Sequence, residues 1–472
     1  MSAAIHWLRR DLRFNDNPAL SAARSAAGPE PVFSVYSLSD LDRLNRRQNA
    51  FVVSCLHELR AAAMRRDATV SLLRGDPAAA LVSAARRLNA SAVYCCRAYN
   101  ASERQQASEV GRSLAAAGVE LHAVDGNVIH QPEAVADRKR AAGEGYRVFP
   151  PFYEAWKSLP VPAASAQSWP TGRDAEMGPL PEAPDEAHAA ALQGAGEAEA
   201  RKALHSFAAG RVADYAVNAE YPARDGTSHL AEALRFGCVS ARETYHAIVG
   251  RMVRSWTLAQ ERLSMELFVR RLALREFFIH LAFFANDLHE VELQQKMRTA
   301  PSCDDEERLE AWSSGRTGYP LVDAAMRQLR REGRVHRRAA IAAASFCCFD
   351  LGLGWRAGRD IWMGELTAAD EALCDANWQM IAGVGTDQAA YPRIYNPQKQ
   401  LRHFDAQAAY VRRYCSELSR LPTYAALAPW RLERQQQIEL GFFTPGHYPR
   451  PIVEHETAAR AALAAYKTHR NR

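Results

Sequence analysis

Thr317–Leu329 has the sequence T-G-Y-P-L-V-D-A-A-M-R-Q-L and opens the stretch, ending at Gln400, that is most informative about the fold. Its apolar residues recur at the spacing of one helix face. The stretch closes with D-A-N-W-Q-M-I-A-G-V-G-T-D (Asp375–Asp387) and P-R-I-Y-N-P-Q-K-Q (Pro392–Gln400). Aromatic side chains, arginines and single carboxylates stand where a helical core is normally aliphatic. This mixture suits a pocket for a large aromatic, phosphate-bearing cofactor; an ordinary helical core with snorkelling arginines is the alternative.

Short apolar runs alternate with alanine-rich stretches over the first 130 residues. We expect strands at Ala4–Leu8, Pro31–Ser37, Thr69–Leu73, Ser91–Cys96 and Val119–Val124. Alternation of strand and helix predicts a parallel sheet covered on both faces. Asn17 and Pro18 are expected to begin the first helix. No glycine-rich phosphate loop follows the first run, so a dinucleotide site is not expected there.

The composition changes twice further along the chain. Residues 159–194 are rich in proline, alanine and acidic residues, which predicts a linker wrapped over the surface. From residue 196 onward the pattern is helical almost to the end. We therefore predict an α/β, Rossmann-like domain over residues 1–130, an interdomain linker over 131–195 and an all-α domain over 196–472.

Charge and cysteine content narrow the class of protein. The net charge of +5 permits a nucleic-acid partner without demanding one. Nine cysteines occur without C-x-x-C spacing, which argues against a metal site and for a reducing compartment. No signal peptide is visible and no apolar run is long enough to span a membrane. We expect a cytoplasmic protein with no membrane segment.

The motifs, taken in order, resemble the photolyase/cryptochrome family. They are W-L-R-R-D-L-R-x-x-D-N-P-A-L near the N-terminus, G-E-G-Y-R-V-F-P-P-F-Y-E-A-W (Gly143–Trp156), T-G-Y-P-x-V-D-A-A-M-R-Q-L, W-x-x-G, N-W-Q, A-G-x-G-x-D and R-I-x-N-P. The resemblance covers nearly the whole chain. It implies an FAD held inside the all-helical domain, blue light as the input, and a helix near Trp156 that braces the two domains. Relatives can carry a second, antenna chromophore, a folate or a deazaflavin, in the N-terminal domain.

The resemblance also implies which residues contact FAD. In the family a turn that here is D-G-T-S-H-L (Asp225–Leu230) grips the pyrophosphate. In isolation this turn would be a plain helix cap. The positions carried over are Tyr215, Thr227, Ser228, His229, Leu230, Arg275 for the flavin, and Asp370 for the flavin's imide edge.

Three further positions concern the redox chemistry of the flavin. Cys374 stands where photolyases keep an asparagine and some light-sensing cryptochromes a cysteine; a small buried hydrophobe is the alternative. Trp378 and Trp355 occupy the first two places of the family's electron-transfer chain. The third place falls near Ser302 and holds no aromatic, so Trp362 is a candidate substitute exit.

The substrate side departs from the dimer-repairing photolyases. At the five positions that contact the lesion those enzymes have glutamate, tryptophan, asparagine, methionine and tryptophan; this chain has Arg271, Leu274, Arg337, Ile341 and Met380. Six-four photolyases need histidines at two of these positions. The charge of Arg271 and Arg337 also suits a reduced flavin. We place Arg338, Arg393 and Gln400 on the same side, where arginines could contact DNA phosphates.

Two functions from different classes follow from the resemblance. The substitutions favour a cryptochrome-like photoreceptor that acts on an unknown protein signalling partner. The alternative is a DNA photolyase that repairs pyrimidine dimers by light-driven electron transfer from reduced FAD. Repair of an unusual lesion by a differently lined pocket is a third hypothesis.

Overall fold

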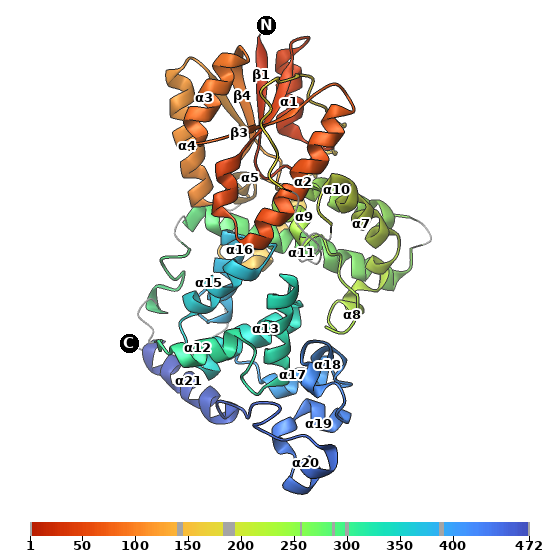
Figure 1. Cartoon of the computed structure of the whole chain (residues 1–472), viewed down its shortest axis with the longest axis vertical. Coiled ribbons are helices and arrows are strands. Elements are labelled where there is room, and N and C mark those ends of the chain that lie inside the picture. Colours follow the sequence, from red (N-terminus) through yellow and green to blue (C-terminus); the bar gives the residue numbers. More distant parts are fainter. Residues whose placement is uncertain are drawn as a thin grey trace. The chain divides into compact units, whose positions relative to one another are not determined.

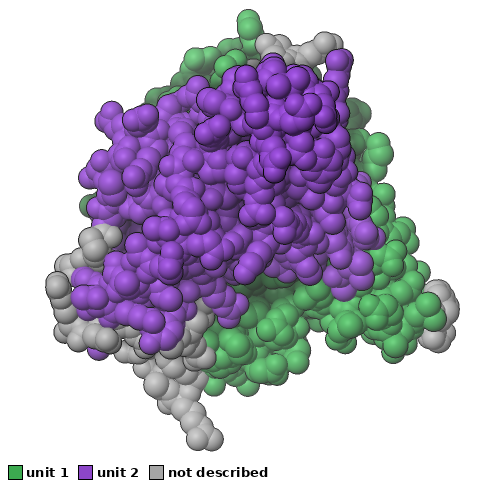
Figure 2. All heavy atoms as spheres, turned by 90° about the horizontal axis from the view of Figure 1, so that it is seen from below, with its two compact units in different colours: residues 1–215, 228–286 green, residues 216–227, 287–472 purple. Residues whose placement is uncertain are grey.

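The computed structural model describes residues 2–138, 145–182, 194–254, 257–285, 288–297, 302–386 and 391–470. The chain divides into two compact units (Figure 2). Unit 1 comprises Met1–Tyr215 and Ser228–Asn286, and unit 2 comprises Ala216–Thr227 and Asp287–Arg472. This is a division by compactness, and the sequence domains 1–130, 131–195 and 196–472 remain predictions.

Unit 1 is built on a five-stranded, wholly parallel sheet of order β3-β2-β1-β4-β5 (Figure 1). The strands are β1 (Ala3–Leu8), β2 (Val32–Ser37), β3 (Val70–Leu73), β4 (Ala90–Cys96) and β5 (Glu120–Val124). They alternate with α1 (Pro18–Ala27), α2 (Arg46–Met64), α3 (Pro77–Arg87) and α4 (Ala101–Ala116). Every residue of β1, β2 and β3 is buried, as a sheet covered on both faces requires. The α/β prediction is confirmed.

Local capping chemistry sets where α1 begins. The backbone N–H of Leu20 donates to Oδ1 of Asn17 at 3.0 Å, and Pro18 occupies the first helical turn. Asp76 and Asn100 cap α3 and α4 in the same way. These helix starts are decided by neighbours in sequence, which is why the expectation for Asn17 and Pro18 is confirmed.

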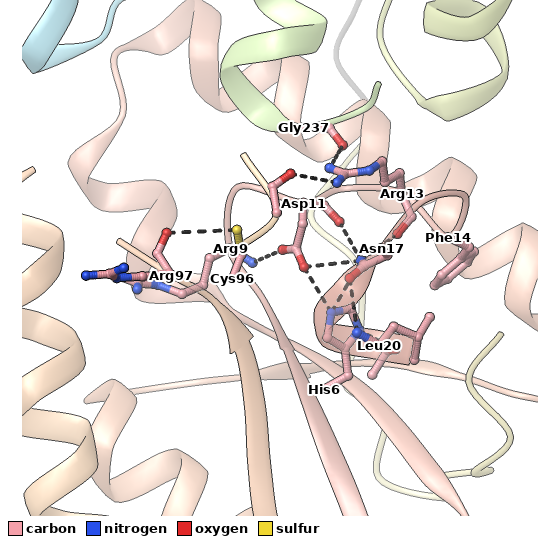
Figure 3. Close-up of polar contacts among 12 residues, drawn as sticks. His6, Arg9, Asp11, Arg13, Phe14, Asn17, Leu20, Cys96, Arg97 and Gly237 are labelled. Carbon is pink, nitrogen blue, oxygen red and sulfur yellow. Dashed lines mark hydrogen bonds and ion pairs between the residues drawn. The ribbon is translucent and has the colours of Figure 1, made fainter. Parts of the chain in front are cut away.

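The polar residues of the N-terminal motif form a buried network at the end of β1 (Figure 3). Oδ2 of Asp11 lies 3.0 Å from Nε2 of His6 and accepts from Nδ2 of Asn17 at 3.1 Å. Burial opposes ionisation of Asp11, but its hydrogen bond with His6 lowers the pKa of that carboxyl. Arg13 donates to the carbonyls of Gly126 and Gly237, both at 2.9 Å. The motif therefore braces unit 1.

The predicted linker contains two helices and an extended strap. The helices are α5 (Pro132–Ala136) and α6 (Phe149–Ser158). The strap follows the sheet: the N–H groups of Thr171 and Gly172 both donate to the carbonyl of Val32 at 2.9 Å. Arg60 donates to the carbonyls of Met177 and Gly178. Residues 139–144, which include the start of the G-E-G-Y motif, and residues 183–193 lie outside the described part.

Unit 1 is completed by α7 (Glu197–Ala209), α9 (Ala231–Phe236), α10 (Ala241–Met252) and the long α11 (Ala259–Ala285); α8 (Tyr215–Asn218) spans the boundary between the units. Glu276 of α11 is 3% exposed. Its carboxylate accepts from Nε1 of Trp156 at 2.8 Å, from the N–H of His130 at 3.2 Å and from the N–H of Ile129. Glu276 thereby fastens α6 to α11.

The described part of unit 2 is helical, apart from an isolated bridge between Cys303 and Leu353. Its helices are α12 (Glu306–Ser313), α13 (Pro320–Glu332), α14 (Arg337–Ser345), α15 (Trp355–Glu365), α16 (Glu371–Ile381), α17 (Pro397–Phe404), α18 (Ala409–Tyr414), α19 (Thr423–Leu427), α20 (Arg434–Leu440) and α21 (His455–Arg470). The prediction of a helical C-terminal part is confirmed. Across the described residues, no helix combines the length and apolar character needed to cross a membrane.

The first residues of the T-G-Y-P motif donate hydrogen bonds to a buried carboxylate, that of Asp323. Asp323, one turn into α13, is fully buried and accepts from the N–H and the hydroxyl of Thr317 at 2.7 and 2.6 Å. It also accepts from the N–H of Gly318 at 3.1 Å and from the hydroxyl of Tyr448. In this way the carboxylate accepts hydrogen bonds from buried donors that would otherwise be unpaired. The motif is a structural clamp of unit 2.

Candidate functional site

The predicted cofactor residues belong to both units, and each set is described within its own unit. Tyr215 lies in unit 1, edge-on to the rings of Phe207 and Phe268, with centroids 6.0 and 5.3 Å away. Phe268 stands on α11, so α11 positions Tyr215. Arg271, Leu274 and Arg275 also stand on α11, and all three are partly exposed.

The turn before α9, which is predicted to contact the FAD phosphates, is ordered by a side-chain hydrogen bond. Oγ of Ser228 accepts from the N–H of Leu230 at 3.4 Å, which orders the hydroxyl-bearing turn. His229 has a left-handed backbone with φ of 55°, and Leu230 starts α9 without a side-chain cap. A turn of this kind offers a hydroxyl and helix N–H groups to an anion. Thr227, the preceding residue, is partly exposed and belongs to unit 2.

Arg275 makes two backbone contacts that the sequence did not predict. Its Nη1 donates to the carbonyl of Asn127 at 3.0 Å and its Nη2 to the carbonyl of Leu234 at 3.2 Å. The guanidinium so ties α11 to the last turn of α9. Its predicted flavin contact stays a prediction.

In unit 2 the predicted flavin-side residues Asp370 and Cys374 stand one turn apart at the start of α16. Asp370 is 3% exposed, and its Oδ1 caps the helix by accepting from the N–H of Leu373 at 3.2 Å. Removal from bulk water raises the pKa of the Cys374 thiol to about 12. The thiol therefore stays protonated at neutral pH and is a weak hydrogen-bond donor.

Trp378, also on α16, lies in a notch of α15 made by a glycine. A Cβ atom at Gly358 would lie 2.5 Å from Cη2 of Trp378, so no other residue fits there without displacing the indole. Trp355 stands three residues before Gly358 and Trp362 four residues after it, on the same helix face. The ring centroid of Trp362 is 5.2 Å from that of Trp378, and that of Trp312 is 6.1 Å away. Two further indoles, those of Trp362 and Trp312, therefore pack against Trp378.

Trp355 follows a π-helical turn (η5, Phe346–Asp350) and borders a cleft of about 700 Å³. Its Nε1–H donates to Oε1 of Glu292 at 3.1 Å, and the guanidinium of Arg356 lies 4.5 Å from its ring centroid. Ser302, near the empty third place of the predicted tryptophan chain, also lines the cleft. No local pattern marks Glu292 in the sequence, because its partners lie 63 and 64 residues further along.

Two predicted substrate-side arginines are paired with a carboxylate. Glu220 binds both Arg337 and Arg338 within unit 2. Burial opposes its charge, but the two guanidinium groups lower the pKa of Glu220 below its usual range. The guanidinium of Arg338 also lies 4.6 Å from the ring centroid of Phe404. The pairing reduces the net charge of this cluster from +2 to +1 and weakens the argument that Arg337 supplies an uncompensated positive charge.

The remaining predicted substrate-side residues are partly or fully accessible within unit 2. Ile341 and Met380 are partly exposed on α14 and α16, Gln400 is partly exposed on α17, and Arg393 is exposed in the preceding loop. Their contacts with a substrate stay predictions. All nine cysteines are free, and no cluster of three metal-ligating side chains occurs in the ranges the structure describes.

His336, which precedes Arg337, is expected to make unit 2 less stable in acid. Its Nε2–H donates to the carbonyl of Ala219 at 3.1 Å, and Nδ1 accepts from the N–H of Arg338, so the imidazole is neutral. Burial lowers the pKa of His336 to about 4. The unfolded value is about 6.5, so the stability from the neutral ring is complete above that pH and is lost as the pH falls towards 4.

The free energy of unfolding, measured at pH 4.5 and at pH 7, should show the contribution of His336. His336→Asn, which can still cap α14, should reduce the loss of unfolding free energy between these pH values by about 2 kcal/mol. His130 in unit 1, with its pKa also lowered to about 4, leaves some acid sensitivity in the variant. His205→Asn, at an exposed site, is the control. Equal pH dependence in wild type and His336→Asn would contradict the assignment.

The chain thus combines a parallel α/β domain with a helical part that contains clustered, buried tryptophans. Residues 4–168 match the family model described as DNA photolyase, and residues 268–468 match the model of the FAD binding domain of DNA photolyase. The chain is 31% identical to the deoxyribodipyrimidine photo-lyase of Halobacterium salinarum over 99% of both chains. It is 32% identical to that of Salmonella typhimurium over 100% of this chain and 99% of the relative.

Solved structures agree with these matches. A bacterial class III photolyase from Agrobacterium tumefaciens superposes with a TM-score of 0.88 at 29% identity, over 100% of this chain and 98% of the other. A cryptochrome from Synechocystis superposes with a TM-score of 0.85 at 23% identity, over 98% and 99%, which shows a shared fold. The chain belongs to the photolyase/cryptochrome family, and its C-terminal part contains an FAD-binding domain.

The donor groups fit FAD. In unit 1 the hydroxyl of Ser228 and the uncapped start of α9 match the needs of a diphosphate. In unit 2 Asp370 supplies a carboxylate, a group of the kind that accepts a hydrogen bond from an imide N–H, and its Oδ1 here accepts from the N–H of Leu373. The second, antenna chromophore remains a prediction, as do the individual FAD contacts.

Proposed function

We propose that this protein is a light-driven DNA repair enzyme, a photolyase that splits pyrimidine dimers with an electron from reduced FAD. The observation that carries the proposal is the full-length match: relatives named deoxyribodipyrimidine photo-lyase align over 98–100% of the chain at about 30% identity in several organisms. The substrate would be a dimer displaced from the DNA base stack, since the reacting bond is otherwise inaccessible.

The chain's own residues would bind the cofactor, orient it and return it to its reduced form. When bound, FAD supplies blue-light absorption and the exchanged electron. Ser228 and the start of α9 would hold its phosphates, and Asp370 would orient its ring. Trp378 and Trp355 would return the cofactor to the reduced form by passing electrons towards it. Arg338 and Arg393 would contact DNA phosphates.

A repair assay tests the proposal directly. Purified protein with chemically reduced FAD is mixed with an oligonucleotide that carries one cyclobutane thymine dimer, and restored thymines are counted after blue illumination. We expect light-dependent repair, with none in the dark or without FAD. Absence of repair at protein concentrations that saturate the damaged DNA would overturn the proposal.

A photoreceptor is the second candidate, and the substrate-side residues favour it. Leu274 and Met380 offer no aromatic face to a displaced base, and stacking on such a face contributes about 1–3 kcal/mol per base. The loss of two faces would weaken dimer binding by two to four orders of magnitude. A sensor would show light-driven flavin reduction without repair, and would act through a protein signalling partner.

A binding measurement on dimer-containing DNA adds a quantitative comparison of the two candidates. Leu274→Trp together with Met380→Trp restores two stacking faces. If the wild type is a repair enzyme with a weakened pocket, the double variant should bind dimer-containing DNA at least tenfold more tightly, about 1.4 kcal/mol. Undamaged DNA of the same sequence is the control, since stacking on the dimer does not affect it.

A further inference from the structure

Trp355 is joined to a buried carboxylate through its indole N–H. The distance from Nε1 to Oε1 of Glu292 is 3.1 Å. Trp355 is 6% exposed and Glu292 is 8% exposed. The described residues give Trp362, the other indole of this helix face, no such acceptor, because its Nε1 is buried without a hydrogen-bond partner. The two tryptophans on α15 therefore differ in where their N–H proton can go.

Arg356 completes the arrangement and is held firmly in place. Its Nη1 donates to the same Oε1 of Glu292 at 2.7 Å. Its Nε and Nη2 donate to the carbonyls of His289 and Glu290 at 2.7 and 2.6 Å. The guanidinium lies 4.5 Å from the ring centroid of Trp355. A positive charge so close to the ring opposes the loss of an electron from it.

We propose that Glu292 is the proton acceptor for Trp355 during light-driven electron transfer, a role that rests on the proposed function of this protein as an FAD photoenzyme. When bound, FAD would supply the light-driven oxidation of Trp378, and Trp355 would then give one electron to the oxidised Trp378. The Nε1–H bond of Trp355 breaks, and an O–H bond forms on Oε1 of Glu292. The products are a neutral tryptophan radical and a neutral carboxylic acid.

The electrostatics favour this coupled step over simple electron loss. A Trp355 radical cation would place two positive charges together, on the indole and on Arg356. Transfer of the proton removes the positive charge from the ring and neutralises the carboxylate of Glu292. Although burial opposes its charge, the hydrogen bond from Arg356 lowers the pKa of Glu292, so the carboxylate is ionised and able to accept at neutral pH.

Proton transfer also slows the recombination of the charges that are separated along the short tryptophan chain. The third aromatic is missing near Ser302, so no aromatic residue at that place takes the hole from Trp355. A neutral radical cannot recover its electron without recovering its proton, which slows the reverse reaction. The cleft at Trp355, which Ser302 also lines, gives a small reductant such as a thiol or phenol room to approach. When the radical is reduced, the proton returns from Glu292.

Flash spectroscopy on the FAD-loaded protein tests the proposal, because neutral and cationic tryptophan radicals have different absorption spectra. Glu292→Gln keeps the size and the hydrogen-bond acceptor but cannot take the proton. We expect the neutral radical in wild type, formed more slowly in D2O. In Glu292→Gln we expect the cationic radical, with charge recombination at least tenfold faster. Glu292→Asp should restore part of the neutral radical.

Two further variants keep the outcome clear. Arg356→Lys keeps a positive charge beside Glu292 and leaves the Trp355–Glu292 hydrogen bond in place, so it should still give the neutral radical, which excludes a general disturbance of this region as the cause. Trp355→Phe should remove the neutral radical altogether. A cationic radical in wild type, or an unchanged spectrum in Glu292→Gln, would overturn the proposal. The dimer-repair assay starts from chemically reduced wild-type protein, so it judges the proposed function separately.

Discussion

Replacing Trp378 by phenylalanine is expected to slow light-driven reduction of bound FAD by more than about 100-fold, equivalent to a barrier at least ~2.7 kcal/mol higher. Phenylalanine fills most of the same space, but its ring gives up an electron far less readily than an indole. The measurement is the rate of flavin bleaching under blue light with an external thiol, from the oxidised protein.

The packing around Trp378 explains why one residue should matter so much. Its ring sits in the notch at Gly358, beside Trp362 and Trp312, and is 3% exposed. Trp378 therefore has two further indoles within electron-transfer distance of its ring. Trp362→Phe and Trp355→Phe, measured separately, show which side of the notch carries the hole. The proton acceptor at Trp355 favours that side.

The matched control is Trp430→Phe in the same unit. Trp430 packs 5.3 Å from the ring centroid of Tyr319 and is remote in the chain from α15 and α16. Its replacement should leave the bleaching rate within about twofold of wild type, a barrier change of ~0.4 kcal/mol. Bleaching at the wild-type rate in Trp378→Phe would show that electrons reach the flavin by another path.

Features that depend on neighbours in sequence could be predicted well. The five strands of unit 1 were expected within a residue or so of their observed bounds, because each is a short apolar run between helical stretches. The start of α1 followed from Asn17 and Pro18 alone. The helical C-terminal part followed from the 3.6-residue periodicity, and the family from the order of the motifs.

Features that depend on side chains far apart in sequence could not be predicted. Glu220 reaches Arg337 across 117 residues, and no local pattern marks it as their partner. Gly358 looks like a weak point inside a helix, yet it is the space into which Trp378 fits. Arg275 was predicted as a flavin contact only, since the carbonyls of Asn127 and Leu234 that it binds leave no trace in the sequence.

The T-G-Y-P motif was recognised in the sequence, but the structural role of its carboxylate was not predicted. The second prediction concerns that carboxylate, Asp323. The motif supports the assignment to the family, but its carboxylate serves structure in unit 2. Asp323→Ala would leave the N–H and hydroxyl of Thr317, the N–H of Gly318 and the hydroxyl of Tyr448 without their acceptor, all in a fully buried place. We expect a loss of about 3–5 kcal/mol in the free energy of unfolding.

Three comparisons identify the cause of that loss by denaturant unfolding. Asp323→Asn retains one acceptor oxygen and the shape of the side chain, so it should cost about half as much as alanine. Tyr448→Phe removes a single donor to the carboxylate and should cost about 1.5–3 kcal/mol. Asp360→Ala removes a carboxylate that is 59% exposed and should change stability by no more than about 0.5 kcal/mol. If Asp323→Ala were no more destabilising than Asp360→Ala, Asp323 would not be the clamp that its hydrogen bonds indicate.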